Sequence, residues 1–342
     1  MTQKSESASV VSLDIGGYSV KSVELAQVAG KYQLRRVVIF PFQSSASSES
    51  GDLRDVLGAA LQPFLSRPQK IRISLSGASL LMRRIQMPAM TSAELKSAIL
   101  FEAESQIPFP IRDCLLDFQV LNTSADNTTL TVLLVAAKKD FVEHRLKILA
   151  GLNVLPEVID ADIFCLMNAF EALGNDGGQK TYGLLDIGHK GSSFAILQDR
   201  LPFVLREIPV GSSSVTKHIA ETKGIPIAEA ERLKNTRPEA MRSELRQATK
   251  AGYETLIEEI SHSVDYFENE TGEDLKTIWV SGGGVIAEGT VAFLSEELGK
   301  EARVWDNLKK IDVSPTVDRK NLTDHSHELS VALGMALDRR GH

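Results

Sequence analysis

The feature that most constrains the fold of this chain is an apolar run ending in Asp-Ile-Gly, because the run occurs twice. The first copy occupies residues 10–17 and the second occupies residues 181–188. Short apolar, β-branched runs bounded by glycine are typical of buried strands. Each copy is followed by two more strand-like runs, with turns near 29–31 and 198–200. The sequence therefore predicts an antiparallel three-stranded meander in each half of the chain.

Two such glycine turns facing each other would suit a polyphosphate. Glycine lets backbone N–H groups approach an anion closely, because it has no Cβ. The aspartates beside the turns, Asp14 and Asp186, can hold a divalent cation, usually through its waters. One Asp-Ile-Gly alone is best explained as an ordinary strand-to-turn signal. Two copies with matching hairpins favour a clamp for a polyphosphate and its Mg²⁺.

The composition is that of an ordinary globular protein of about two domains. The 342 residues are 43% hydrophobic and 24% charged. A net charge of −7 argues against a nucleic-acid partner, which requires a basic face, and against charge-driven binding to an anionic membrane. The longest apolar stretch, residues 132–137, is far shorter than the roughly 20 residues of a membrane span. We therefore expect no direct membrane insertion. The isolated Cys114 and Cys165 indicate reduced cysteines of the cytoplasm.

A distinct block begins with a capping box. Thr91 is the predicted N-cap of a helix, and Glu94 follows three residues later. The helix carries one apolar stripe, formed by Leu95, Ile99, Ala103 and Ile107. Leu100 and Phe101 lie off this stripe, so the helix is expected to touch two surfaces.

A third glycine site follows a predicted strand at 277–281. Gly282, Gly283 and Gly284 separate this strand from a helix predicted at 287–298. Backbone N–H groups at a helix N-terminus suit a nucleotide phosphate, although glycine turns are common in α/β loops. The site gains weight from its position about 95 residues after Asp186, where a β-β-β-α-β unit would be finishing.

These three glycine sites together resemble the two phosphate motifs and the adenosine motif of the actin-like ATPase superfamily. The block at 87–110, with the strand at 116–121, is more specific and resembles the PilM family of type IV pilus assembly proteins. The resemblance covers the chain from about residue 10. It implies a mixed α/β actin-like ATPase fold, in which two RNase-H-like halves hold ATP and Mg²⁺ between them.

The resemblance also implies a domain organisation. The expected parts are a disordered arm at 1–9, a first half at 10–180 with an FtsA/PilM-type subdomain inserted at about 76–151, a second half at 181–324 with a helical subdomain at about 216–275, and a C-terminal helix at 325–342 that returns to the first half.

Roles for individual residues follow from the same resemblance. Asp14 and Asp186 would orient waters on the nucleotide's Mg²⁺, and Lys21 would reach the β- and γ-phosphates. The other implied nucleotide-binding residues, from the three glycine sites and an Ala-Glu-x-x-Lys helix, are Gly16, Gly17, Tyr18, Ser19, Gly188, Ser192, Glu231, Lys234, Gly282, Gly283 and Gly284. Two alternatives stand beside these roles, namely a solvent-exposed Lys21 and a Glu231–Lys234 pair on a helix surface.

Water activation is implied for the start of the helix before the second phosphate motif, where Asp160 and Asp162 lie. Each aspartate is equally well explained as an N-cap or first-turn acid, and we expect at least one to be the N-cap. Gly17 replaces a serine that relatives usually carry, and residues 189–191 make the second turn unusually basic. His189 could contact phosphate or lie exposed in the turn. These departures leave hydrolysis open, so the implied activity is ATP binding with weak or no ATPase activity.

The implied function is that of a cytoplasmic scaffold in the inner-membrane platform that assembles type IV pili, the machinery of twitching motility. The scaffold would bind the cytoplasmic tail of a PilN-like membrane protein, and would lie peripherally on the inner membrane. The groove for this tail is expected beside the inserted subdomain, near residues 107–110. Other pilus assembly proteins and a second copy of the chain are further partners that the resemblance allows. ATP would act mainly as a ligand that sets the angle between the halves.

Three alternatives share the superfamily. A small-molecule kinase would need a phosphoacceptor cleft with a catalytic carboxylate, and the block at 87–110 stands where a sugar-binding insert would be expected. An FtsA-like cytoskeletal protein would carry a terminal amphipathic membrane-binding helix, which residues 339–342 do not resemble. The cytoplasmic part of the type II secretion protein GspL would be joined to a membrane segment.

Overall fold

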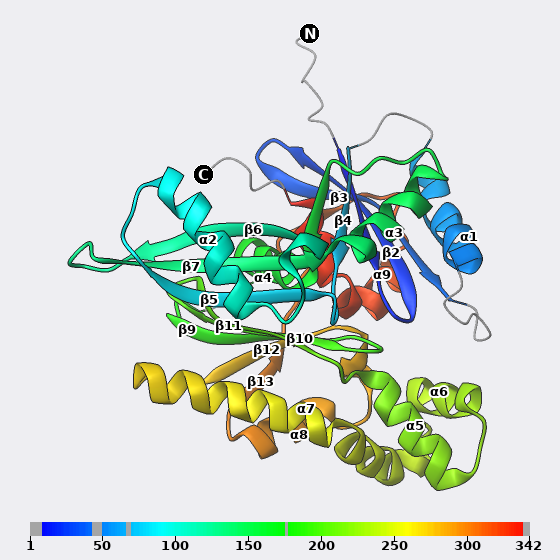
Figure 1. Ribbon diagram of the computed structural model, residues 1–342. Helices are drawn as coiled ribbons and strands as arrows, with labels where there is room; N and C mark the ends of the chain where they lie inside the picture. Colours follow the sequence, from blue (N-terminus) through cyan, green and yellow to red (C-terminus); the bar gives the residue numbers. More distant parts are fainter. Residues whose placement is uncertain (1–8, 43–49, 66–69, 175–176, 338–342) are drawn as a thin grey trace.

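The computed structural model describes residues 9–42, 50–65, 70–174 and 177–337. The arm predicted at 1–9 lies outside the described residues except for Ser9. Figure 1 shows two α/β halves stacked on each other, with a smaller sheet attached to the side of the first.

The first half is built on a six-stranded sheet with the order β14-β3-β2-β1-β4-β8. Its strands are β1 (Val10–Ile15), β2 (Ser19–Val28), β3 (Lys31–Pro41), β4 (Lys70–Leu75), β8 (Val158–Ala161) and β14 (Asp312–Val313). Strands β1, β2 and β3 form the predicted antiparallel meander, and β4 pairs with β1 in parallel. The helices of this half are α1 (Ser50–Leu61), α3 (Lys139–Ala150), α4 (Asp162–Leu173), α9 (Arg319–His325) and α10 (Ser330–Ala336).

The second half repeats this plan. Its five-stranded sheet has the order β11-β10-β9-β12-β13. The strands are β9 (Thr181–Ile187), β10 (Ser192–Gln198), β11 (Leu201–Ile208), β12 (Thr277–Ser281) and β13 (Glu301–Val304), and the helices are α5 (Ser212–Lys223), α6 (Ile227–Thr236), α7 (Arg242–Thr271) and α8 (Thr290–Leu298). Strand β12 pairs with β9 in parallel, as β4 pairs with β1. The two Asp-Ile-Gly strands therefore occupy equivalent central positions, which confirms the predicted repeat.

The inserted unit is a three-stranded sheet covered by one helix. It comprises β5 (Leu80–Pro88), α2 (Ser92–Gln106), β6 (Cys114–Thr123) and β7 (Thr129–Lys138), with the strand order β5-β7-β6. The predicted capping box at the start of α2 is present, since the Glu94 amide donates to Thr91 Oγ1 over 3.3 Å and the Thr91 amide donates to Glu94 Oε2 over 2.8 Å.

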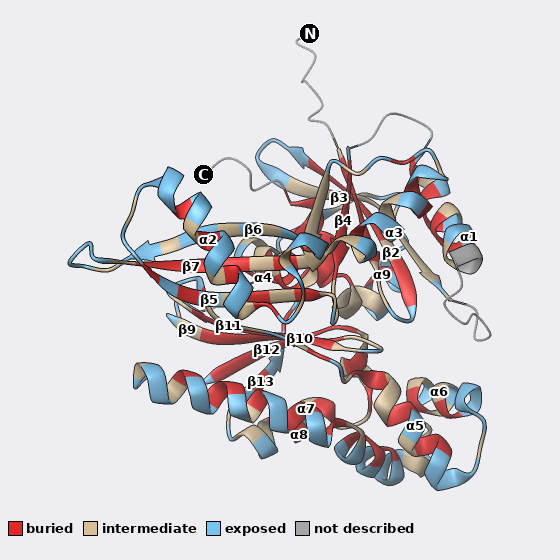
Figure 2. Ribbon diagram, in the orientation of Figure 1, coloured by how far each residue is buried: buried red, intermediate tan, exposed pale blue. Residues whose placement is uncertain are grey.

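Helix α2 packs through a single face. Leu95, Ile99 and Ala103 are buried, whereas Leu100 and Phe101 are exposed to 49% and 77%. The prediction that this helix touches two surfaces is therefore wrong for the chain as described, because the outer face of α2 lies in solvent (Figure 2).

Two boundaries differ from those predicted. Ile148 and Leu149 of α3 pack in the same apolar cluster as Leu57 of α1 and Ile73 of β4. Helix α3 therefore belongs to the first half, and the inserted unit ends with β7 rather than near residue 151. At the other end of the chain, β14 already pairs with β3, so the return to the first half begins near residue 312, before the predicted boundary at 324.

Helix α10 completes the first half from the far end of the chain. Ser12 Oγ on β1 donates to the Ala332 carbonyl over 2.6 Å. Gly334 lies so close to α4 that a Cβ there would stand 1.8 Å from the Cys165 carbonyl oxygen, so only glycine fits. An apolar cluster that includes Phe170 of α4 and Leu333 of α10 also extends to β9, and thereby joins the two halves.

Within the described residues, no helix combines the length and apolar character needed to cross a bilayer.

Candidate nucleotide-binding cleft

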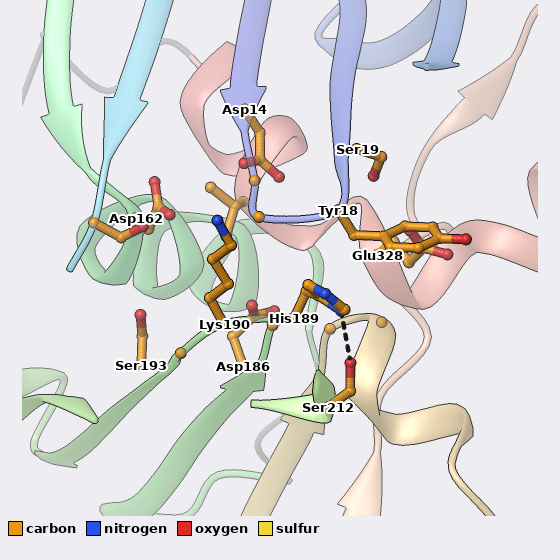
Figure 3. A pocket seen from close by; sticks show the side chains of 18 of the residues that line it. Asp14, Tyr18, Ser19, Asp162, Asp186, His189, Lys190, Ser193, Ser212 and Glu328 are labelled. Carbon is orange, nitrogen blue, oxygen red and sulfur yellow. Dashed lines mark hydrogen bonds between the residues drawn. The ribbon is translucent and has the colours of Figure 1, made fainter. Parts of the chain in front are cut away.

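A cavity of about 950 Å³ lies between the two halves (Figure 3). This volume is within the range of small-molecule and cofactor sites. Its walls come from the β1–β2 turn, the β9–β10 turn, helix α6 and the glycines after β12. The two repeated turns and the third glycine site therefore meet at one cavity, although they are spread over most of the chain.

The first turn holds a buried ion pair. Asp14 ends β1 and Lys21 lies directly opposite on β2, which brings Lys21 Nζ to 3.0 Å from Asp14 Oδ2. The Lys21 side chain is only 13% exposed, so the alternative of a solvent-exposed lysine does not hold. Burial lowers the pKa of Lys21, but Asp14 and Glu328 outweigh it and raise the pKa above its usual value. The lysine therefore stays charged in the cleft.

The first turn is tightly closed at Gly16. The Gly16 amide donates to the Ser19 carbonyl over 3.1 Å. A Cβ on Gly16 would stand 3.0 Å from that carbonyl oxygen and 3.1 Å from Lys21 Nζ. The turn thus keeps its backbone close to the cavity, as the repeat predicted.

The second turn places a half-buried carboxylate in the same cavity. Asp186 Oδ1 accepts a hydrogen bond from Ser281 Oγ on β12 over 2.7 Å. Burial raises the pKa of Asp186 to about 6, against the opposing effects of this hydrogen bond and of Lys21. The Gly188 amide donates to the Gly191 carbonyl over 3.0 Å and closes the turn.

The two turns contact each other across the cleft. The rings of Tyr18 and His189 lie 5.3 Å apart between centroids. A Cβ on Gly17 would stand 3.0 Å from Lys190 Cγ, so the glycine makes room for the lysine stem. His189 is half-buried against Tyr18, and burial lowers the pKa of its imidazole. His189 is therefore part of the cleft wall rather than an exposed turn residue.

Helix α6 contributes a charged network to the cleft. Lys234 Nζ lies 2.8 Å from Glu231 Oε2 and donates to Thr216 Oγ1 of α5 over 2.9 Å. Lys234 is 3% exposed, which excludes the alternative of an ion pair on a helix surface. Both residues line the cavity, and burial lowers the pKa of Lys234 despite its charged partner.

The third glycine site packs mainly against β9. Gly282 has a φ of 92°, and a Cβ there would stand 2.4 Å from the Ile187 carbonyl oxygen. A Cβ on Gly284 would stand 2.3 Å from Ile187 Cγ2. Gly282 and Gly283 line the cavity, whereas Gly284 lies behind them in the core. The segment Gly283–Ile286 is a 3₁₀ turn, so α8 begins later than predicted and does not start at the glycines.

Two residues predicted for the nucleotide site, Ser192 and Asp160, do not line the cleft. Ser192 Oγ donates to the Val210 carbonyl over 2.7 Å and is buried, while its neighbour Ser193 faces the cleft. Strand alternation explains the exchange. Asp160 lies on β8 and lines a different cavity.

The N-cap predicted for Asp160 or Asp162 is also corrected. The N-cap residue of α4 is Ala161, and no side chain caps the helix. Asp162 is the first helical residue and lines the cleft, where burial and then the nearby Asp14 raise the pKa of its carboxyl group. Asp162 thus keeps the position expected of a water-activating residue, and Asp160 does not.

Sequence reasoning missed Glu207 on β11. Its Oε1 accepts from Ser193 Oγ over 2.9 Å, and its Oε2 accepts from the Gly77 amide of the first half over 3.2 Å. Burial and the Asp162 carboxylate raise the pKa of Glu207 to about 8. The sequence signal that was available is an acid on the same face of β11 as Phe203 and Leu205, in a largely apolar strand.

Glu328 was missed as well. It lines the cavity close to Gly283. Its Oε1 lies 2.9 Å from His325 Nδ1, and the histidine tautomer decides which of these two atoms carries the hydrogen. It lies before α10, far from every glycine motif, so no sequence pattern marked it.

Asp14 and Asp186 fit a magnesium ion held through water. Both carboxylates line the same cavity, and burial is the largest cause of the raised pKa of Asp186, so a nearby cation would stabilise its charged form. Within the described part of the chain, no group of three or more His, Cys, Asp or Glu side chains could hold a metal ion unaided. A cation here would need oxygen ligands from water and phosphate, which is how Mg²⁺ is commonly bound.

A second cavity, of about 550 Å³, lies beside the inserted sheet. Leu133 and Val135 of β7 line it, whereas the alternate residues Val132 and Leu134 pack toward α2. The cavity is therefore on the face of the sheet away from α2. Its other walls come from β6, β8, α4 and the β10–β11 turn of the second half: Leu115, Asp117, Ile159, Phe164, Met167, Arg200, Leu201 and Pro202.

Residues 107–110, near which the groove was expected, lie on the opposite face of this sheet. Ile107 is buried in the cluster under α2, and Phe109 packs under Lys138, whose Nζ is 4.4 Å from the ring centroid. Residues 107–110 therefore close the core of the inserted unit, and the second cavity is the better candidate for a groove.

The repeated halves and the cleft between them define an actin-like ATPase fold. The family model described as type IV pilus assembly protein PilM matches residues 12–340, and the chain belongs to this family. The fold and the family expected from the sequence are thereby confirmed. The family match favours PilM over the kinase, FtsA-like and GspL-like alternatives.

Similar solved structures support the fold. A PilM chain from a "PilM-PilN type IV pilus biogenesis complex" has 24% identity and a TM-score of 0.84, covering 96% of this chain and 97% of that one. The ethanolamine utilization protein EutJ from Carboxydothermus hydrogenoformans has 14% identity and a TM-score of 0.53, covering 96% and 89%. MreB5 of Spiroplasma citri bound to AMPPNP has 10% identity and a TM-score of 0.51, covering 96% and 95%.

Proposed function

We propose that this chain is a nucleotide-binding scaffold of the type IV pilus inner-membrane platform, with ATP and Mg²⁺ between its halves and a PilN-like tail in the second cavity. The observation that carries the nucleotide site is the meeting of two glycine turns, each with an aspartate that lines the cleft, at one cavity of nucleotide size. The MreB5 relative is described as bound to AMPPNP, which supports a nucleotide in a cleft of this fold.

Different residues of the cleft would bind different parts of the nucleotide. Asp14 and Asp186 would orient waters on Mg²⁺, and Lys21 would bind the β- and γ-phosphates as a point charge. Backbone amides at Gly17 and Tyr18 would donate to phosphate oxygens, with Ser19 beside them. The Gly16 and Gly188 amides close their own turns, so these two glycines would shape the backbone around the phosphates rather than donate to them. Bound Mg²⁺ supplies the positive charge that offsets the cleft carboxylates.

Helix α6 and the third glycine site would hold the nucleoside. Glu231 and Lys234 already form a buried pair, so their polar atoms are fixed before a ribose or adenine arrives. Gly282 and Gly283 leave an open surface at the cavity for an adenosine. We exclude Gly284, Ser192 and Asp160 from the site, and include Ser193 and Glu207.

Asp162 is the candidate base for hydrolysis. Burial and Asp14 raise the pKa of its carboxyl group toward neutrality, which suits a general base at neutral pH. We expect weak turnover for a different reason, because Gly17 replaces the serine that relatives usually carry in the first turn. The nucleotide would then act chiefly as a ligand that shifts the arrangement of the two halves.

The second cavity suits an extended apolar peptide. Strand β6 is an outer strand of the inserted sheet, and its Leu115 is 47% exposed beside the cavity. The related complex is described as PilM with PilN, which supports a PilN-like tail as the occupant. Recruitment through such a tail would place the chain at the cytoplasmic face of the inner membrane, and would leave other faces for further pilus proteins or another copy.

Thermal unfolding with and without Mg·ATP tests the nucleotide site. Ligand at 100 times its dissociation constant stabilises a protein by about 2.7 kcal/mol. We expect wild type to melt at a higher temperature with Mg·ATP, and the Asp14→Ala, Lys21→Ala double variant, which loses both members of the buried pair, to show no shift.

The double variant needs its own folding check, because the pair is buried. Its circular dichroism and its melting curve without nucleotide report folding directly. A wild-type protein that saturating Mg·ATP leaves unshifted would remove the nucleotide from the proposal.

A further inference from the structure

The cleft between the halves is rich in carboxylates and has one lysine without an ion-pair partner. The carboxylates that line it are Asp14, Asp162, Asp186, Glu207, Glu231, Asp324 and Glu328. Lys21 is paired with Asp14, and Lys234 is paired with Glu231. Lys190 also lines the cleft but, among the described residues, forms no ion pair. Its positive charge is thus not used by the protein alone.

Lys190 crosses from the second half to the first. It belongs to the β9–β10 turn, and its stem lies on Gly17 of the β1–β2 turn, where a Cβ would stand 3.0 Å from Lys190 Cγ and 3.3 Å from Cδ. In Figure 3 the Lys190 side chain extends from the β9–β10 turn toward the first half, in the direction of the β1–β2 turn. The lysine therefore ends beside the turn that presents backbone amides to a phosphate.

We infer that Lys190 binds the terminal phosphate of a nucleoside triphosphate from the second half, and so makes the cleft prefer triphosphate over diphosphate. This inference rests on the proposed nucleotide site and adds a specificity-determining residue to it. A diphosphate lacks the group that the ammonium would reach. A nucleotide shifts the equilibrium between arrangements of the halves only through its different affinity for the two arrangements, and a contact from Lys190 to the terminal phosphate would add such a difference for the triphosphate.

The chemistry of the contact favours phosphate. An ammonium donates charge-assisted hydrogen bonds to phosphate oxygens, which are about twice as strong as neutral ones. Because Lys190 forms no ion pair among the described residues, no ion pair is broken when the phosphate binds. Gly17 favours the approach, since a Cβ there would stand 3.0 Å from Lys190 Cγ and the stem would have to shift slightly. The unusually basic second turn and the missing serine of the first turn thus have one common explanation.

Nucleotide titration calorimetry with Mg²⁺ tests the inference, using ADP and a nonhydrolysable ATP analogue on wild type and three variants. Lys190→Met keeps the stem on Gly17 and removes the charge, and Lys190→Arg restores a charge. Lys217→Met is the matched control, because Lys217 is an exposed lysine of the same half on α5 and does not line the cleft. For Lys190→Met we expect about tenfold weaker binding of the ATP analogue, with ADP binding changed less than about twofold.

The outcomes separate the inference from the site on which it rests. Restored triphosphate preference in Lys190→Arg and unchanged binding by Lys217→Met support a specific charged contact. If wild type binds both nucleotides and Lys190→Met weakens both equally or neither, the inference is overturned while the nucleotide site stands. If wild type binds neither nucleotide, the proposed site and the inference both fail.

Discussion

At the scale of single residues, burial governs the acids of the cleft. Asp186 and Glu207 have pKa values raised to about 6 and about 8, and in both cases burial is the largest cause. Glu207 also joins the halves, because Ser193 of the second half and the Gly77 amide of the first donate to the same carboxyl group. Its protonation state therefore bears on the contact between the halves.

Stability should depend on pH through Glu207. Its pKa in the folded state is above the value of about 4.3 in an unfolded chain, so the folded state retains a proton between these pH values. Stability therefore falls as pH rises through this window. Glu207→Gln mimics the protonated form. We expect its melting temperature, relative to wild type, to rise by about 2 °C or more from pH 5.5 to pH 8.

Melting curves of both proteins across this pH range provide the measurement. Glu254→Gln, at an exposed position of α7, is the control that removes an ordinary carboxylate. Parallel pH profiles for Glu207→Gln and wild type would contradict the prediction.

At the scale of elements, the sequence identified motifs well and side-chain directions less well. The Asp-Ile-Gly strands, the Lys21 hairpin and the capping box were predictable because each is a local pattern. Whether Ser192 or Ser193 faces the cleft depends on the pairing of β10 with β9 and β11, which no local pattern shows.

Longer-range partners explain the remaining differences. Strand β5 was not predicted, since Arg83 and Arg84 interrupt its apolar run, and Arg84 is accommodated by the Phe203 ring of the second half, 4.2 Å from the guanidinium carbon. Glu207 was missed because its partner Gly77 lies 130 residues away in the chain.

The capping box of α2 should stabilise the inserted unit locally. Thr91 Oγ1 accepts from the Glu94 amide and donates to the Glu94 carboxylate over 2.7 Å. Thr91→Ala removes both contacts, and we expect a loss of about 1 kcal/mol. Faster amide hydrogen exchange in the first turn of α2 is the direct measurement. Ser97→Ala, at an exposed position within the same helix, should leave this exchange unchanged. Equal exchange in all three proteins would show that the cap contributes nothing.

At the scale of the whole molecule, the second cavity has walls from all three units. The inserted sheet supplies β6 and β7, the first half supplies β8 and α4, and the second half supplies residues 200–202. A peptide bound there would contact each unit at once. The cavity thus offers a single place where a partner could sense the arrangement of the halves.

Leu115→Asp should abolish binding of a PilN-like tail peptide. The substitution puts a charge beside an apolar cavity, and we expect at least a tenfold loss of affinity in fluorescence anisotropy. Phe101→Asp, on the exposed face of α2, tests the groove position expected from residues 107–110 and should bind normally. Leu155→Asp, at an 84% exposed leucine that lines neither cavity, is the matched control. Loss of binding in Phe101→Asp with retention in Leu115→Asp would move the groove to α2.

Strand β14 and helix α10 give the chain an unusual order of completion during synthesis. The first half cannot close its core until β14 has paired with β3 and Gly334 has settled against Cys165. Both segments leave the ribosome after the entire second half. Domains usually fold in the order in which they emerge, but here the earlier half must wait for the later one, with its six-stranded sheet unfinished. The nucleotide cleft therefore comes into existence only when translation of these last segments is done.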